Sequence, residues 1–158
     1  MRRVASPVVV VIAEPASGTP RGATIGSFTS VALDPPLVSF NVARGTRIHG
    51  TLSSADRFAV HLLAHDQADV AAHFADPALD GERQLSAYRP AEASAAGGSP
   101  LIPDSLGMLV CRIESRLEAG DHTVIVGRVV DVLPGRDAPP LVYHRQEYGT
   151  VKSGGGAQ

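Results

Sequence analysis

The sequence predicts a mainly β fold, in which antiparallel strands form a barrel together with two or three short helices. Three observations support this prediction. β-branched segments of strand length are bounded by clusters of turn residues such as Pro, Gly and Asp. Toward the C-terminus, apolar and polar residues alternate with a period of two. Helical spacing is confined to short stretches, without the regular strand-helix alternation of a doubly wound sheet. The 158 residues, 44% of them hydrophobic, suffice for a single domain over 1–158, and no internal repeat is apparent.

The first third of the chain reads as strands. Residues 8–12 are β-branched throughout, and the turn-rich stretch 14–20 ends them. Residues 23–33 are rich in small and hydroxyl side chains and read as one extended segment. Asp34-Pro35-Pro36 halts that segment, because the two prolines lack a backbone donor. Residues 37–42 are predicted to form the next strand.

The middle of the chain carries the short helices. The spacing of apolar residues predicts one helix over 46–54, and residues 58–63 return to strand. Asp66 is expected to cap a second helix, which covers a sheet with its apolar face and ends near Asp76-Pro77. Residues 91–103 show no clear period and predict a surface loop that touches a site or a partner.

The final third predicts a long hairpin and one short strand. Apolar and polar residues alternate with a period of two over residues 109–118, so one face of this strand is expected to be exposed to solvent. The second long strand covers 123–133, and Gly127 within it marks a bulge or a close backbone approach. Residues 141–143 form the last strand. The tail 153–158 has almost nothing to bury and is expected to be mobile.

Composition and charge argue against several classes of partner. The formal net charge is -2 and the basic residues are scattered, so no nucleic-acid partner is expected. The apolar run 8–13 is too short for a signal peptide or a membrane span, so no membrane partner is expected either. Cys111, the single cysteine, excludes an internal disulfide, reads as a small buried residue and suits a reducing cytoplasm.

Motifs of several enzyme classes are absent from the sequence. It contains no Gly-rich phosphate fingerprint, no Walker loop and no nucleophile elbow. His61 and His65 have the spacing of two metal ligands on a helix, but His61 falls in a predicted strand and no third ligand presents itself. No metal site is therefore expected.

Four segments, which follow one another from about Val8 to Val151, carry a family resemblance. They are GATIGSFTSVALDPPLV at 22–38, FAVHLL at 58–63, GDHT with IVG at 120–127, and PLVYH leading to Tyr148-Gly149. Together they resemble the flavin reductase-like, FMN-binding split-barrel family, in which asparagine is usual at the position of His61. The resemblance implies an antiparallel split β-barrel (Greek key), a homodimer, bound FMN or FAD, and NADH or NADPH as co-substrate.

The segment from Thr24 to Val31 has the residue types that a flavin ring requires. The small residues Gly26 and Ser27 let the main chain approach the ring. The hydroxyls of Ser27 and Ser30 can donate hydrogen bonds to the ring, and Phe28 can pack against one of its edges. Taken alone, the same segment also reads as an edge strand without a ligand. The expected flavin contacts in this segment are Thr24, Ile25, Gly26, Ser27, Phe28, Ser30 and Val31.

For the flavin phosphate and ribityl chain, the resemblance points to the first helix. Thr46 and Arg47 open that helix, whose N-terminal amides favour an anion. Arg83 is a second candidate cation or a solvated surface residue, and Phe74 contacts the flavin or packs in the core. The expected contacts in this part are Gly45, Thr46, Arg47, Thr51, Leu52, Phe74, Ala75 and Arg83.

For the nicotinamide, the resemblance points to His122. This residue is expected to orient the carboxamide and exclude water, and Tyr148 to complete the pocket. Hydride transfer depends on positioning, so no side chain is assigned as acid or base. The implied function is an NAD(P)H:flavin oxidoreductase that supplies reduced flavin to a partner monooxygenase. The alternatives are a flavin-binding module without nicotinamide turnover and a flavoenzyme that acts on another substrate.

Overall fold

The computed structural model describes residues 3–79, 81–88 and 100–151. Most of the loop expected at 91–103, and the tail at 153–158, lie outside these residues. Three short helices accompany the strands: α1 (Arg47–Ser54), α2 (Ala68–Ala75) and α3 (Gly81–Leu85). Within the part that is described, none of these helices has the length and apolar content needed to cross a membrane.

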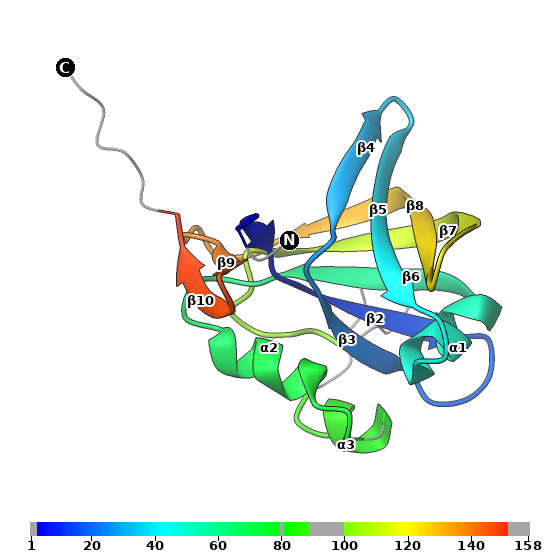
Figure 1. Cartoon of the computed structure of the whole chain (residues 1–158), viewed down its shortest axis with the longest axis horizontal. Helices are drawn as coiled ribbons and strands as arrows, with labels where there is room; N and C mark the ends of the chain where they lie inside the picture. Colours follow the sequence, from blue (N-terminus) through cyan, green and yellow to red (C-terminus); the bar gives the residue numbers. More distant parts are fainter. Residues whose placement is uncertain (1–2, 80, 89–99, 152–158) are drawn as a thin grey trace.

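A seven-stranded antiparallel sheet dominates the molecule (Figure 1), and a three-stranded sheet lies beside it. The order of the large sheet is β3-β2-β6-β7-β8-β5-β4, and that of the small one is β1-β9-β10. The strands of the large sheet are β2 (Val9–Pro15), β3 (Arg21–Ile25), β4 (Thr29–Leu33), β5 (Pro36–Ala43), β6 (Ala55–Leu62), β7 (Gly107–Ala119) and β8 (His122–Pro134). Those of the small sheet are β1 (Ser6–Pro7), β9 (Leu141–His144) and β10 (Glu147–Thr150).

The large sheet rolls up without closing. Its two edges, β3 and β4, have no ladder between them in the described chain, yet only residues 26–28 join them. Because the four peptide steps from Ile25 to Thr29 span at most about 14 Å, the edges must lie close together. The expected mainly β, split-barrel fold is therefore confirmed, with an open seam between β3 and β4.

The extended segment predicted over 23–33 is divided into two strands at this seam. β3 pairs with β2, whereas β4 pairs with β5, so residues 26–28 leave one edge of the sheet and enter the other. The Ser27 hydroxyl holds this crossing, because it accepts the backbone N–H of Asn41 at 2.9 Å. The extended conformation expected over 23–33 is present in β3 and β4, but the composition of the segment does not show the change of partner between them.

The two larger clusters of the core lie on opposite sides of β2. Alternate residues of β2 enter different clusters, Val9 and Val11 on the inner side of the rolled sheet and Val10 and Ile12 on the outer side. This double burial explains the uninterrupted apolar run. Leu52 of α1 packs into the inner cluster, and α2 covers the outer one.

The predicted cap of α2 is wrong. The helix begins at Ala68 with Gln67 as its N-cap, and no side chain makes a capping hydrogen bond there. Asp66 instead pairs with Arg136, which precedes β9 in the chain, and this hydrogen bond lowers the pKa of the Asp66 carboxyl. The Asp66 carboxylate therefore pairs with an arginine from a distant segment and does not cap the helix, although the local sequence had indicated that it would.

Gly127 marks the close approach that its place in a strand predicted. A β-carbon at this position would lie 2.3 Å from the ring of Phe58 and 3.2 Å from the β-carbon of Cys111. Phe58 in turn packs edge-on against Phe40, with ring centroids 5.2 Å apart. Cys111 is fully buried, as expected, and burial raises the pKa of its thiol to about 12.

Candidate functional site

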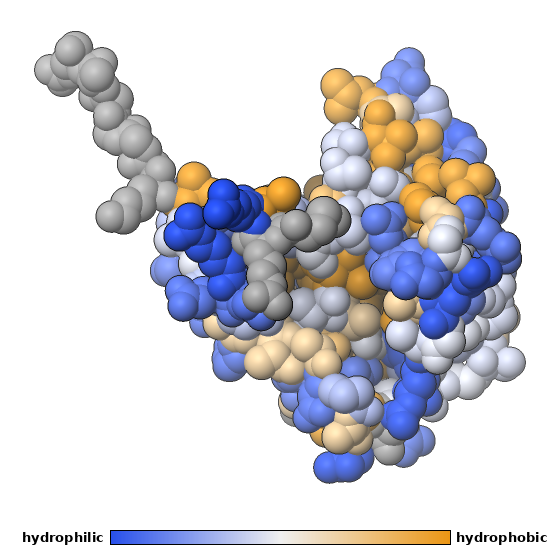
Figure 2. All heavy atoms as spheres, viewed as in Figure 1, coloured by the Kyte–Doolittle hydropathy of each residue, from blue (hydrophilic) through white to orange (hydrophobic). Residues whose placement is uncertain are grey.

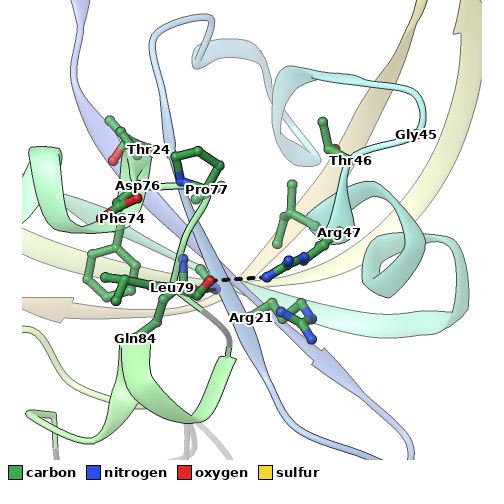
Figure 3. A pocket seen from close by; sticks show the side chains of 14 residues that line it. Arg21, Thr24, Gly45, Thr46, Arg47, Phe74, Asp76, Pro77, Leu79 and Gln84 are labelled. Atoms are coloured by element: carbon green, nitrogen blue, oxygen red, sulfur yellow. Dashed lines mark hydrogen bonds between the residues drawn. The ribbon is translucent and has the colours of Figure 1, made fainter.

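An open groove of about 480 Å³ runs between β3, the beginning of α1 and the segment from α2 to α3 (Figure 3). We call it the main groove. It is lined by Arg21, Gly22, Ala23, Thr24, Gly45, Thr46, Arg47, Ile48, Phe74, Ala75, Asp76, Pro77, Leu79 and Gln84.

One wall of the main groove forms where α2 and α3 are tied to β3. The Thr24 hydroxyl donates to the carbonyl of Ala71 at 2.6 Å, and the Gly22 N–H donates to Oε1 of Gln84 at 3.3 Å. The Phe74 ring lies directly against Gly22, where a β-carbon would be 2.4 Å from a ring carbon. Only glycine allows this contact, so the position of the wall depends on Gly22.

The opposite wall is cationic. Arg47 is the first residue of α1, and the hydroxyl of the N-cap Thr46 accepts the N–H of His49 at 3.3 Å. The Arg47 guanidinium reaches the Leu79 carbonyl at 3.5 Å, as the dashed line in Figure 3 shows. Arg21 of β3 lines the same groove, and no salt bridge among the described residues involves either arginine.

Two further concave sites adjoin the main groove. The tyrosine pocket, of about 160 Å³, shares Thr24 with it and is lined by Val8, Thr24, Ile25, Gly26, Tyr143 and Tyr148. The hydroxyl groove, of about 480 Å³, shares Arg21 and Arg47 with it and is lined by Pro15, Ser17, Thr19, Arg21, Arg47, Gly50, Thr51 and Ser54.

Many residues expected to bind the flavin lie together in these sites. Six of them line the main groove: Thr24, Gly45, Thr46, Arg47, Phe74 and Ala75. Ile25 and Gly26 line the tyrosine pocket, and Thr51 lines the hydroxyl groove. Residues from four separate parts of the sequence thus meet along the β3 edge of the sheet.

Other expected residues lie outside the three sites. Leu52 is fully buried in the inner core, and Phe28 packs against that core. The Ser27 hydroxyl is engaged with Asn41. Ser30 and Val31 lie on the exposed edge strand β4, and Arg83 lies exposed on α3.

His122 and Tyr148 are not brought into one pocket within a single chain. His122 is the first residue of β8, and its Nδ1 lies 2.7 Å from Oδ1 of Asp121, a hydrogen bond that lowers the pKa of the Asp121 carboxyl. Tyr148 belongs to β10, where its ring lies 5.3 Å from that of Tyr143. Figure 1 shows the β7–β8 turn near α1 and β10 on the other side of the molecule.

Sequence reasoning missed several residues that line these sites, among them Gln84, Tyr143 and Arg21. Gln84 and Tyr143 carry no local signal, because helix α3 and the β9–β10 hairpin bring them to the site. Arg21 directly precedes the signature segment, and that position is the one signal that points to it.

A rolled antiparallel sheet that stays open between β3 and β4, with a cationic groove beside its β3 edge, defines a small split-barrel protein. The chain belongs to the flavin reductase like domain family, whose family model matches residues 1–152. Among the residues that the structure describes, no three His, Cys, Asp or Glu side chains are grouped to hold a metal ion.

Curated and solved relatives agree with this family. The NADH:riboflavin 5'-phosphate oxidoreductase of Streptomyces pristinaespiralis is 37% identical over 155 residues, which cover 95% of this chain and 84% of that protein. The reductase component of 4-hydroxyphenylacetate 3-monooxygenase from Thermus thermophilus is 34% identical over 148 residues, covering 94% and 90%. Two longer curated relatives are spanned over only 39% and 51% of their length.

A solved structure shows the same fold. The NADH:FAD oxidoreductase of Streptomyces globisporus, in complex with NAD and FAD fragments, superposes with a TM-score of 0.82 at 31% identity. The match covers 92% of this chain and 85% of that one. The family and the fold expected from the four sequence segments are thereby confirmed.

Proposed function

We propose that this chain is an NADH-dependent flavin reductase that hands reduced flavin to a partner monooxygenase. The family supports this function, as do the names of relatives that reduce flavin with NADH or serve as monooxygenase reductase components. The observation that carries the proposal for this chain is the main groove, which joins the unpaired edge of β3 to a cationic helix start.

The groove fits the phosphate end of a flavin nucleotide. Arg21 and Arg47 face it without a carboxylate partner among the described residues. At the start of α1, Thr46 accepts the N–H of His49, and the N–H groups of Arg47 and Ile48 have no intrahelical acceptor. Asp76 also lines the groove, but its Oδ1 accepts the N–H of Ala78 at 2.8 Å. Guanidinium groups and helix N-terminal amides together favour a phosphate.

The remaining groups suit the other parts of a flavin. Thr24 and Ala75 also line the groove, and the ribityl chain would lie beside them, because the Thr24 oxygen can still accept a hydrogen bond. Ile25 and Gly26 continue the strand edge into the tyrosine pocket, where the ring would lie. Gly26 is exposed and has no side chain, so its main chain is accessible to a ring.

When bound, a flavin supplies N5 as the acceptor of the hydride from NADH. The residues of this chain then need only hold the reactants in position and exclude water, since no proton must move at a side chain. We assign His122 and Tyr148 to nicotinamide binding, in keeping with the sequence resemblance. Because they lie apart within one chain, we propose that they meet at a site between two protomers.

The proposed homodimer would also cover exposed apolar surface. Figure 2 shows apolar side chains gathered on the projecting hairpin of β4 and β5. Leu33 and Val31 of this hairpin are 89% and 53% exposed, and Val132 of β8 is 57% exposed. Edge strands such as β4 are usually covered in stable proteins, and a second copy of the chain supplies a cover.

The test is NADH oxidation, followed at 340 nm, with FMN, FAD or riboflavin added in turn. We expect oxidation that depends on both the protein and the flavin; parallel reactions with NADPH establish the nicotinamide preference. Quenching of flavin fluorescence without NADH oxidation would favour the flavin-binding module instead. If micromolar protein neither quenches flavin fluorescence nor oxidises NADH, the flavin proposal is refuted.

A further inference from the structure

We propose that the hydroxyl groove is a second subsite, which takes the adenosine-phosphate half of a dinucleotide. FAD and NADH both carry this group. The inference rests on the proposed function, because it places the neighbouring phosphate at the cationic wall of the main groove.

The two grooves meet at a pair of arginines. Arg21 and Arg47 are the residues that line both, so a ligand can pass from one groove to the other beside two guanidinium groups. A dinucleotide has the matching shape, with two adjacent phosphates and a bulky group on each side. Guanidinium groups bind such phosphates through paired hydrogen bonds.

The chemistry of the hydroxyl groove differs from that of the main groove. Four hydroxyl side chains, those of Ser17, Thr19, Thr51 and Ser54, line it, and its lining contains no carboxylate. Hydroxyls both donate and accept, as recognition of ribose hydroxyls and phosphate oxygens requires. The hydroxyls of Thr51 and Ser54 already donate to carbonyls of α1, at 3.2 and 3.3 Å, and keep only their capacity to accept. The hydroxyls of Ser17 and Thr19 make no hydrogen bond within the described residues, so both can donate and accept.

The size of the hydroxyl groove is also suitable. Its volume of about 480 Å³ equals that of the main groove. Sites for small molecules usually measure about 300–1,000 Å³. A mononucleotide bound in the main groove alone would leave this second space and its hydroxyls without a ligand.

Gly50 offers a way to change the hydroxyl groove without touching the main groove. It lies on α1 and lines the hydroxyl groove only. A β-carbon at this position would meet no atom within 4 Å, so a larger side chain can enter without displacing the fold. Gly50→Glu therefore adds a negative charge beside the proposed second phosphate.

Two matched controls separate charge from size and from general electrostatics. Gly50→Gln has the same shape without the charge. Ser53→Glu places the same charge on the same helix, at an exposed residue that lines neither groove. Circular dichroism of all three variants establishes that they fold.

The measurements are the dissociation constants of FAD and FMN by fluorescence quenching, and the KM for NADH with FMN as flavin. We expect Gly50→Glu to raise the dissociation constant of FAD at least about tenfold, through like-charge repulsion, and that of FMN by less than about twofold. A rise of the NADH KM alone would assign the subsite to the nicotinamide dinucleotide. Equal losses for all three ligands, or no loss for any, would overturn the proposal.

AMP distinguishes this inference from the proposed function itself. Calorimetry with the wild-type chain should detect AMP binding that Gly50→Glu abolishes and Ser53→Glu preserves. If FMN fails to bind while AMP behaves in this way, the flavin assignment fails and the subsite stands. If FMN binds and AMP does not, the subsite fails and the flavin assignment stands.

Discussion

At the scale of single residues, Arg47 gives the most direct test of the phosphate site. Arg47→Ala removes one guanidinium from the main groove, while the N-cap hydrogen bond of Thr46 is retained. We expect FMN to bind about tenfold to a hundredfold more weakly, since a hydrogen bond between charged groups contributes about 1.5–3 kcal/mol. Riboflavin lacks the phosphate and should bind almost unchanged. Fluorescence titration measures both ligands.

The control for this substitution is Arg112→Ala. Arg112 is an exposed arginine of β7 that lines none of the three sites. It should leave the affinity of both flavins unaltered. Equal losses of FMN and riboflavin in Arg47→Ala would place Arg47 outside the phosphate site.

His122 tests the assignment of the nicotinamide site. The residue is half-exposed at the start of β8 and lines none of the three sites within one chain. His122→Ala should raise the KM for NADH or slow hydride transfer, with FMN affinity little changed, because its proposed role is to orient the carboxamide. Stopped-flow reduction of bound flavin separates the two effects. Loss of FMN or unfolding, with NADH kinetics unaltered in the flavin-loaded fraction, would make His122 structural.

Because His61 is buried, we expect the free energy of unfolding to fall in acid. Its ring is fully buried, neither ring nitrogen has a hydrogen-bond partner in the described chain, and burial lowers its pKa to about 4, which a contact with the Pro100 backbone partly opposes. Between pH 6.5 and 4 the unfolded chain therefore binds a proton that the folded chain does not. Stability falls as the pH falls through this window, by roughly 2 kcal/mol at pH 5 relative to pH 7.

Urea denaturation at pH 7 and pH 5 measures this effect. His61→Asn, which installs the side chain usual in the family, should remove most of the difference between the two pH values. An unchanged pH dependence in the variant would show that other groups cause the acid sensitivity.

Among the residues that line the three sites, sequence reasoning named those that a local pattern marks. Thr46 and Arg47 follow from the helix start, and Thr24 to Gly26 from the signature segment. Tyr143 could not be found in this way, because it reaches the site only through its pairing with Tyr148 across two strands. Leu52 was included because the family resemblance pointed to it, although its place on the apolar face of the helix already indicated that its side chain is buried in the core.

At the scale of elements, the contact between β3 and α2 controls the main groove. Gly22→Ala would place a methyl group 2.4 Å from the Phe74 ring, so the ring and α2 must shift. We expect a destabilisation of about 1–3 kcal/mol, typical of overpacking, together with weaker flavin binding. Gly50→Ala is the matched control, because its methyl group would meet no atom within 4 Å. This substitution also replaces a glycine inside a helix by a better helix former. Thermal unfolding compares the two variants.

The strands and helices were predicted well wherever the hydrophobic pattern is local. The long hairpin of β7 and β8 follows from period-two alternation, and α1 from its apolar spacing. β10 was missed because Arg145 and Gln146, which make the preceding turn, have positive φ angles of 53° and 70° without the Gly or Asn that usually signals such a turn. The wrong cap at Asp66 has a similar origin, since its partner Arg136 is distant in sequence.

At the scale of the whole molecule, the proposed homodimer predicts that Leu33 is buried on association. Leu33→Lys places a charge on the exposed β4–β5 hairpin, where it would oppose an apolar interface. We expect the wild-type chain to sediment at about twice 16.4 kDa, and the variant to shift to the monomer and lose NADH turnover. Val151→Lys, at another exposed apolar residue, should sediment like the wild type. A wild-type chain that is monomeric at micromolar concentration would contradict the dimer.

The burial of the one cysteine has a consequence for working with this enzyme in air. Reduced flavin that escapes its acceptor reacts with oxygen and yields hydrogen peroxide, which attacks thiolates much faster than thiols. Cys111 is fully buried with a thiol pKa raised to about 12, so it stays protonated and shielded at neutral pH. Aerobic turnover should therefore leave this thiol intact without added reductant. A cysteine newly introduced at the surface would then be the single position that a maleimide dye labels.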